Sequence, residues 1–386
     1  MHSDGYISGR GIARWFPVLS RIDWMLLFFA LPITIAGLLT MQSYGSGSMF
    51  FYRQMTWLAL AVVTFFITAF IDVSMLKKTQ VLVVLFLGAV GVLMLISVAG
   101  RTANGAQSWL SLGGLSVQPS DFVKLILILI LAKYFSRRHI AIGEVKHLVI
   151  SAVYMAIPFL LVFLEPDFGT AMILGLIWLG MALVAGIRKR HLALLFGAGA
   201  VAFIFLWSFV FAPYQKDRIQ TFLNPLRDIH GAGYNARQAV IAVGSGGLLG
   251  KGIGYGTQSR LRFLPEYQTD FIFAAFSEEW GFIGALLLLI VYGLLLARII
   301  SLSLHGASNF ETLFAAGVAI LFMSHLLINV GMNIGVVPVT GITLPFMSYG
   351  GSHLIMEFGA LGILSSMRRS TRKIHPEDLT KEFEGL

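Results

Sequence analysis

The stretch that decides the fold reads Leu264-Pro265-Glu266-Tyr267-Gln268-Thr269-Asp270-Phe271-Ile272-Phe273, and it runs directly into a long apolar segment. Pro265 ends the preceding structure, Thr269 can cap a helix, and the apolar run that follows is long enough to enter a membrane. Asp270 is therefore expected at a boundary between water and lipid. A carboxylate there is either a helix-start anion that interacts with the helix dipole, or a reactive group held against a lipid-linked substrate.

The composition indicates a protein that lies mostly in lipid. Of the 386 residues, 57% are hydrophobic and 12% are charged, whereas soluble domains carry about 25% charged residues. The net charge of +9 does not indicate nucleic-acid binding, because the basic residues stand in short clusters between apolar runs. The chain has no cysteine, which excludes disulfides and thiolate metal sites.

Ten apolar runs have roughly the ~20 residues that a bilayer requires. They lie at about 24–42, 55–71, 81–99, 120–134, 149–164, 169–186, 191–212, 271–299, 311–330 and 353–367. The first run is long enough to span and is followed by more spans, so it is expected to be retained as a helix and not cleaved as a signal peptide. The predicted fold is an all-α polytopic membrane protein of one integral membrane domain, 1–386, with about ten transmembrane helices.

The basic residues predict the orientation. With an even number of spans both termini lie on one side, and the loops of that side hold 18 of the 28 Lys and Arg residues. The tails 1–23 and 368–386 are therefore expected in the cytoplasm. The polar stretches 100–120, 212–269 and 333–352 then face outward, so the chemistry is expected on the outer face of the cytoplasmic membrane. The loop 212–269, between the seventh and eighth spans, is expected to form short amphipathic helices with Gly-rich turns at 244–256.

Several polar residues allow two interpretations. Asp121 and Lys124 lie three apart on one face of the fourth span, either as an ion pair that fixes helix packing or as a pair lining a polar cavity, with Lys124 meeting an anionic substrate. Glu165 and Asp167 flank Pro166 between the fifth and sixth spans, where they could simply end helices. His325, inside the ninth span, favours a hydrogen-bonded contact between helices over a metal ligand.

Two common kinds of site are not supported. The segment 244–251 ends in Gly250-Lys251, but Ser245 stands where a phosphate loop begins with glycine, and Gly252 stands where such a loop has Ser or Thr. The histidines show no pair at the i, i+4 spacing of a helical zinc site, and no protein metal ligand is assigned.

Eight motifs resemble the SEDS family (shape, elongation, division, sporulation), in the family's order across nearly the whole chain. They are Asn104-Gly105-Ala106-Gln107-Ser108-Trp109-Leu110, Gln118-Pro119-Ser120-Asp121-Phe122-Val123-Lys124, Glu165-Pro166-Asp167-Phe168-Gly169-Thr170, Gly231-Ala232-Gly233-Tyr234, the Gly-rich stretch 244–252, Leu264-Pro265-Glu266 with Thr269-Asp270-Phe271-Ile272-Phe273, Asn329-Val330-Gly331-Met332 and Ser348-Tyr349-Gly350-Gly351-Ser352. Gly256-Thr257-Gln258-Ser259 looks more like the elongation branch than the division branch. The chain departs from the family at Asp121, where Glu is usual.

The resemblance implies a peptidoglycan glycosyltransferase that polymerises lipid II at the outer face of the cytoplasmic membrane during elongation, with a class B penicillin-binding protein as transpeptidase partner. It implies Asp270 as the catalytic residue. The residues expected to bind substrate are Lys124, Asp121, Arg218, Gln118, Trp109, Glu165, Asp167 and Ser348. The alternatives are a division-type polymerase, a flippase or transporter of a lipid-linked precursor, and a scaffold that only recruits an enzyme.

The expected reaction needs one base. Pyrophosphate is a good leaving group, so the general acid of a two-carboxylate glycosidase is dispensable, while the attacking 4-hydroxyl still requires a base. Asp270 is the expected base, in an inverting single displacement. Lys124 and Arg218 are expected to stabilise the departing diphosphate, with Mg²⁺ or Mn²⁺ bound to it as the only cofactor considered.

Overall fold

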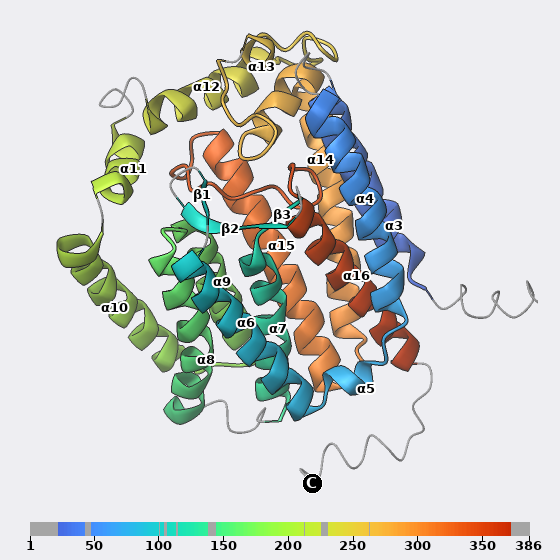
Figure 1. Cartoon of the computed structure of the whole chain (residues 1–386), viewed down its shortest axis with the longest axis vertical. Coiled ribbons are helices and arrows are strands. Elements are labelled where there is room, and N and C mark those ends of the chain that lie inside the picture. Colours follow the sequence, from blue (N-terminus) through green and yellow to red (C-terminus); the bar gives the residue numbers. More distant parts are fainter. Residues whose placement is uncertain are drawn as a thin grey trace, which may run out of the picture.

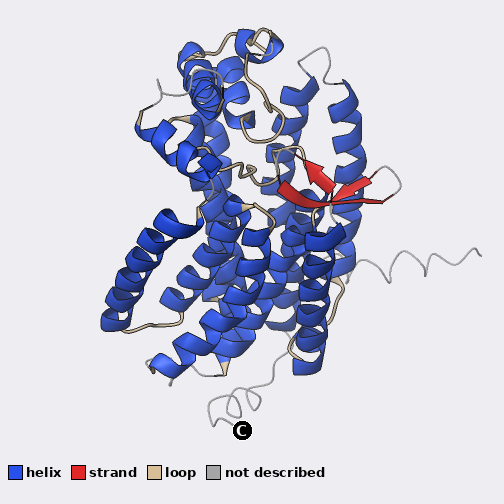
Figure 2. Cartoon of the chain, turned by 60° about the vertical axis from the view of Figure 1, so that its left-hand side comes forward, coloured by secondary structure: helices blue, strands red, loops and turns tan. Residues whose placement is uncertain are grey.

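In the computed structural model the chain forms a bundle of long helices with a smaller layer of short helices and loops over one end (Figures 1 and 2). The described residues are 22–42, 48–99, 101–103, 106–112, 115–137, 144–211, 213–224, 231–261 and 263–371. Of the predicted tails, residues 1–21 and 372–386 lie outside the described residues.

Each predicted span corresponds to a helix. The ten helices are α3 (Trp24–Gln42), α4 (Ser48–Ala69), α6 (Thr79–Ala99), α7 (Pro119–Ser136), α8 (Val145–Leu164), α9 (Phe168–Val184), α10 (Lys189–Phe205, continued by the π-helix η1, Leu206–Val210), α14 (Ile272–Leu304), α15 (Asn309–Asn333) and α16 (Gly351–Thr371). A short helix, α5 (Val73–Leu76), lies between α4 and α6. The predicted helical class is confirmed.

Seven of these helices, as far as the chain is described, are long and apolar enough to cross a bilayer: α3, α4, α6, α8, α10 with η1, α14 and α15. The chain is thus a multi-pass membrane protein. Of the other three, α9 is shorter, with 17 residues, and α7 carries Asp121, Lys124 and Lys133. That all ten helices span the membrane, and in which direction, stays a prediction.

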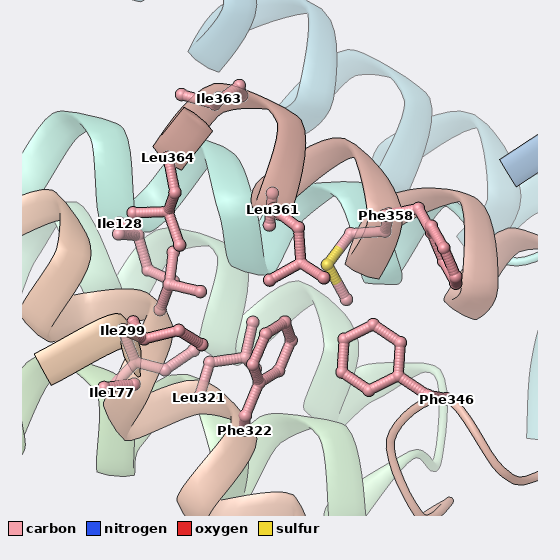
Figure 3. Packing of buried hydrophobic residues seen from close by; sticks show 14 of the residues in the cluster. Ile128, Ile177, Ile299, Leu321, Phe322, Phe346, Phe358, Leu361, Ile363 and Leu364 are labelled. Carbon is pink, nitrogen blue, oxygen red and sulfur yellow. The ribbon is translucent and has the colours of Figure 1, made fainter. Parts of the chain in front are cut away.

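The core lies where α7, α9, α14, α15 and α16 meet (Figure 3). The buried side chains labelled there are Ile128, Ile177, Ile299, Leu321, Phe322, Phe346, Phe358, Leu361, Ile363 and Leu364. α10 is different: after His191 its described side chains, up to residue 210, are all half-buried or exposed, and it stands at the edge of the bundle in both views (Figures 1 and 2). The central helices are therefore held by packing, whereas α10 presents most of its surface to its surroundings.

The long loop folds as predicted into short helices, α11 (Pro213–Leu223), α12 (Ala232–Ser245) and α13 (Thr257–Arg260). Ala239 and Ala242 of α12 pack against Leu264, Tyr267 and the first turn of α14 in a second small core. The loop is therefore a folded layer on the bundle.

A small sheet in the 101–117 region was not predicted. β1 (Arg101–Ala103), β2 (Ala106–Leu112) and β3 (Leu115–Val117) are antiparallel in the order β1-β2-β3, with Leu110 opposite Val117. The sequence does contain a hairpin signal, because Gly113-Gly114 separates two short runs of strand-forming length.

α14 is not one continuous helix, because it breaks at Gly281, where φ is 67° and ψ is −168°. The Gly-rich segment closes the break with backbone bonds. Lys251 N–H donates to the Glu278 carbonyl at 3.0 Å, and Phe282 N–H donates to the Gly247 carbonyl at 2.9 Å. The approach is so close that a Cβ added at Gly250 would lie 2.0 Å from the Glu279 carbonyl oxygen. A Cβ at Gly246 would likewise lie 2.2 Å from the Ser277 carbonyl oxygen, so Gly246 and Gly250 allow close contact between backbones.

The buried Glu278 carboxylate holds the same segment through its side chain. It accepts from Lys251 Nζ at 2.7 Å and from the Thr257 N–H at 2.9 Å. Sequence analysis did not single out Glu278. The lysine that follows Gly250 is therefore paired with a carboxylate of this chain.

We expect Gly281→Ala to destabilise the fold by about 1–3 kcal/mol or more, because this backbone conformation is restricted to glycine and the new Cβ would meet the 248–250 backbone. Gly293→Ala, in the same helix, is the matched control, since an added Cβ there has nothing within 4 Å. Thermal unfolding of both variants in detergent checks this, and equal midpoints would contradict it.

Candidate active site around Asp270

Asp270 lies in the turn that leads into α14, and three consecutive carbonyls of this turn are held by other elements. The Gln268 carbonyl accepts from the Tyr349 N–H at 2.8 Å. The Thr269 carbonyl accepts from the Ser348 hydroxyl at 2.7 Å. The Asp270 carbonyl accepts from the side-chain amides of Asn329 and Asn333, each at 3.0 Å. The backbone that carries the Asp270 carboxylate is therefore fixed to α15 and to the loop before α16.

The two asparagines explain why the turn packs against α15. They lie one helical turn apart on α15, both fully buried, and amides inside an apolar helix need partners. Asn333 also accepts from the Ala274 N–H at 3.2 Å, and Asn329 also donates to the Ile342 carbonyl at 2.7 Å. Their i, i+4 spacing in an apolar span was the available sequence signal.

Thr269 does not cap α14 as predicted. Phe271 is in the capping position and makes no side-chain cap bond, and the Thr269 hydroxyl instead contacts the Glu266 carbonyl at 3.3 Å. The turn is stabilised by its own backbone, with the Thr269 N–H donating to that carbonyl at 3.1 Å. The Asp270 carboxylate is likewise not used as a cap.

The Asp270 side chain is half-buried, and within the described residues it accepts no hydrogen bond. The pKa of Asp270 is raised from 3.8 to about 7, and burial is the largest cause. The negative charges of Glu266 and Asp167 raise this pKa as well, and the positive charge of Arg218 opposes them. The carboxylate can therefore take up a proton near neutral pH, which a base in a displacement reaction must do.

Arg218 of α11 brings a cation to the same place. Its Nη1 lies 3.5 Å from the Thr340 carbonyl, and residue 341 lies directly beside the carboxylate, since a Cβ at Gly341 would be 3.6 Å from Asp270 Oδ2. Arg218 also lines two cavities. One, of about 350 Å³, is lined by Phe168, Met172, Phe203 and Phe211, and the other, of about 460 Å³, includes Arg237. A charged group and an apolar chain could thus bind side by side here.

Asp167 and Gln118 are brought together next to this site. The Asp167 carboxylate caps α9 by accepting from the Thr170 N–H at 3.0 Å, and it also accepts from Gln118 Nε2 at 3.0 Å. The Gln118 N–H donates to the Ser352 hydroxyl at 3.1 Å. Asp167 thus starts a helix and influences Asp270 electrostatically, while Gln118 ties α7 to α9 and α16.

Asp121 and Lys124 form a buried ion pair, 2.9 Å from Oδ1 to Nζ, with both residues at most 3% exposed. Asp121 also accepts from the Ser352 hydroxyl at 2.9 Å and contacts His353 Nδ1 at 3.3 Å. The Asp121 carboxylate therefore has three side-chain partners, Lys124, Ser352 and His353. This geometry favours the helix-packing alternative over direct contact of Lys124 with substrate.

The other predicted residues occupy several elements. The Ser348 hydroxyl is used by backbone groups, since it also accepts from the Leu344 N–H at 2.8 Å, so its placement supports a positioning role. Glu165 is buried at the end of α8. Trp109 lies in β2, and its side chain is outside the described residues. His325 Nδ1 lies 3.1 Å from the Thr343 carbonyl, so it makes a hydrogen-bonded contact as predicted, but to the loop before α16 and not to another helix.

The sequence pattern of a family described as cell cycle protein, which groups FtsW, RodA and SpoVE, matches residues 18–373. The chain belongs to this family. Stage V sporulation protein E of Bacillus subtilis (strain 168) is 36% identical over 362 residues, covering 91% of this chain and 98% of that protein. Peptidoglycan glycosyltransferase MrdB of Escherichia coli (strain K12) is 37% identical over 283 residues, covering 73% and 76%.

The FtsW/RodA/SpoVE fold is also seen in a solved structure described as "Structural coordination of polymerization and crosslinking by a peptidoglycan synthase complex". One of its chains matches with a TM-score of 0.79 at 31% identity, over 92% of this chain and 99% of that chain. The family resemblance found in the sequence is thus confirmed. The nearness to the RodA branch stays a prediction, because the family pattern covers all three branches.

We expect Lys124→Met to destabilise this FtsW/RodA/SpoVE protein by about 3–5 kcal/mol, because it leaves the buried Asp121 carboxylate without its cation. The double variant Asp121→Asn, Lys124→Met removes both charges and should recover most of that loss. Thermal unfolding of the three proteins measures it. A Lys124→Met protein as stable as the parent but slower in polymerisation would instead support contact with substrate.

Proposed function

We propose that this chain is a peptidoglycan glycosyltransferase that polymerises lipid II into glycan strands, with Asp270 as the general base. The observation that carries the proposal is one carboxylate with a pKa of about 7, on a turn whose backbone is held by other elements and beside an arginine that lines an apolar cavity. Family membership and the enzyme name of the relative MrdB support the same activity.

In the reaction, the 4-hydroxyl oxygen of one sugar attacks the anomeric carbon of a second, lipid-linked sugar. The bond from that carbon to the diphosphate breaks with its electron pair, and undecaprenyl diphosphate leaves. Asp270 accepts the hydroxyl proton as the new bond forms. Because the donor linkage is α and the product is β-1,4, one displacement with inversion suffices, and one carboxylate is enough.

Arg218 is the cation that this arrangement offers to the leaving group. A guanidinium can bind two phosphate oxygens at once. The 350 Å³ cavity beside it is lined by four aromatic or methionine side chains and has the chemistry to hold the isoprenoid carbons next to the diphosphate. The direct substrate contacts of this proposal are therefore Asp270 and Arg218. Gln118, Asp167 and Ser348 position the elements around them.

A divalent ion would have to come with the substrate. Among the described residues there is no group of three His, Asp or Glu side chains placed to hold a metal. The residues present do not fit a cage built by protein alone, so no step is assigned to Mg²⁺ or Mn²⁺.

The orientation predicted from the basic loops determines on which side of the membrane the reaction would take place. The basic loops favour a cytoplasmic membrane location with Asp270 on the outer face, where elongation would use it. A class B penicillin-binding protein is the proposed transpeptidase partner. This is supported by the structural neighbour, which comes from a complex described as coordinating polymerization and crosslinking.

Asp270→Asn should lower polymerisation by at least about 100-fold, the usual contribution of general base catalysis. The assay is glycan formation from lipid II by the purified protein, and thermal unfolding confirms that the variant is folded. Polymerisation near the parental rate would refute the role of Asp270. If the parent instead moves lipid II across vesicles and forms no polymer, the protein is a flippase.

The pH profile of kcat/KM should show one acid limb near pH 7, because the base works only when deprotonated and the pKa of Asp270 is about 7. Below this pH the rate should fall about tenfold per unit. The assignment would be contradicted by a kcat/KM that does not change with pH from about two units below this pKa to about one unit above it.

Two single variants should move this limb in opposite directions. Glu266→Gln removes a negative charge that raises the pKa of Asp270, so the limb should shift to lower pH. Arg218→Gln removes the cation that lowers this pKa, so the limb should shift to higher pH, and KM should rise as well. Shifts in one common direction would show that the limb reports another group.

A further inference from the structure

A third cavity lies at the opposite end of the bundle from Asp270. It is formed where the end of α14, the start of α15 and the end of α16 meet, and its volume is about 360 Å³. Asp270 lies just before the first residue of α14, whereas Arg298 follows that residue by 26 positions and lies near the other end of the helix. The cavity is therefore separate from the polymerisation site.

The polar wall of this cavity holds two cations, Arg298 and Arg368. His305 and Ser301 also line it, and its one acid is Glu311. Glu311 is already paired with Lys77, 3.1 Å away. The acidic neighbour of the two arginines is a different residue, Asp23.

Both arginines share one carboxylate, that of Asp23. Arg298 contacts it through Nε, at 3.0 Å from Oδ2, and through Nη2. Arg368 Nη1 lies 3.2 Å from the same oxygen. Asp23 is fully buried, and its own N–H donates to the Ser365 hydroxyl at 2.9 Å. One negative charge therefore fixes two guanidinium groups in place without neutralising both.

The remaining donors of the two guanidinium groups have no acceptor among the residues that the structure describes. Each guanidinium has five N–H donors in a planar fork that matches phosphate oxygens. Their side chains are partly exposed, 20% for Arg298 and 37% for Arg368. The donors are thus both prearranged and accessible.

The other wall of the cavity is apolar, formed by Leu302, Ala315, Leu364 and Met367. A phosphate next to apolar carbon matches this pair of walls. The sequence continues after Arg368 with Arg369, Arg372 and Lys373, and basic clusters directly after a span attract anionic headgroups. The volume also falls in the lower part of the range of small-molecule sites, about 300–1,000 Å³.

We propose that this cavity, here called the Arg298–Arg368 pocket, binds a phosphate group, with the two arginines as its donors. The phosphate can belong to the headgroup of an anionic phospholipid in the adjacent leaflet or to a soluble phosphate compound. The occupied pocket would link the ends of α14, α15 and α16, and so stabilise the bundle at the end remote from the catalytic turn.

The test uses the full-length protein in a zwitterionic detergent. Dioleoylphosphatidylglycerol, dioleoylphosphatidylcholine and inorganic phosphate are titrated separately, with thermal unfolding and native mass spectrometry as readouts. A ligand that binds only the folded protein raises the unfolding midpoint with concentration. Stabilisation by phosphatidylglycerol alone identifies a lipid headgroup, and stabilisation by inorganic phosphate identifies a soluble source. Equal effects of the two lipids, with none from phosphate, would overturn the proposal.

Arg368→Gln should lower the affinity for whichever anion stabilises the parent by about tenfold, which corresponds to the loss of one charge-assisted hydrogen bond. Arg190→Gln is the matched control, because Arg190 is an exposed arginine on α10 outside the pocket. If Arg368→Gln proves too unstable, Ser301→Phe fills the cavity and leaves both ion pairs intact, and it should abolish binding. Binding by Ser301→Phe or Arg368→Gln equal to that of Arg190→Gln would refute the pocket. The readout needs no turnover, so it is independent of the function proposed for Asp270.

Discussion

The position of the proposed base, Asp270, depends on hydrogen bonds that other elements make to the backbone of the 268–270 turn. A carboxylate on a free loop would sample many positions, and each misplacement of about an ångström costs catalytic rate. Here the carbonyls of Thr269 and Asp270 accept from Ser348, Asn329 and Asn333. These donors come from α15 and from the loop before α16, which are parts of the buried core. The position of the carboxylate is thus determined by the packing of the bundle.

That packing depends in turn on polar groups buried inside it. His353 lies between two carboxylates, with Nδ1 3.3 Å from Asp121 and Nε2 2.9 Å from Glu357. Glu357 accepts from the Phe346 N–H at 2.8 Å, which fixes the loop that carries Ser348. Such groups are costly in an apolar interior unless they are paired. Because they are paired across α7, α16 and the 346 loop, they select one arrangement of these elements where apolar packing alone would allow several.

The sequence was sufficient for features that depend on local composition. Long apolar runs fixed the ten helices, and the polar-to-apolar junction placed Asp270 directly before the eighth. Features that depend on distant residues were not predictable. The break at Gly281 exists because Gly247 and Lys251 bond to backbone around it, and no local signal in 272–304 separates it from other glycines of that run. Thr269 failed as a cap because the turn from Glu266 had already fixed the backbone.

The charged residues around Asp270 also connect substrate binding to the pKa of its carboxyl group. Glu266 and Asp167 raise the pKa of this carboxyl, and Arg218 lowers it. A bound diphosphate next to Arg218 would offset the positive charge of the arginine and add negative charge of its own, so the pKa of Asp270 would rise further. The carboxylate would then be a stronger base when the leaving group is in place than in the empty site. As the diphosphate departs the field reverses, which favours release of the proton and restores the base for the next sugar.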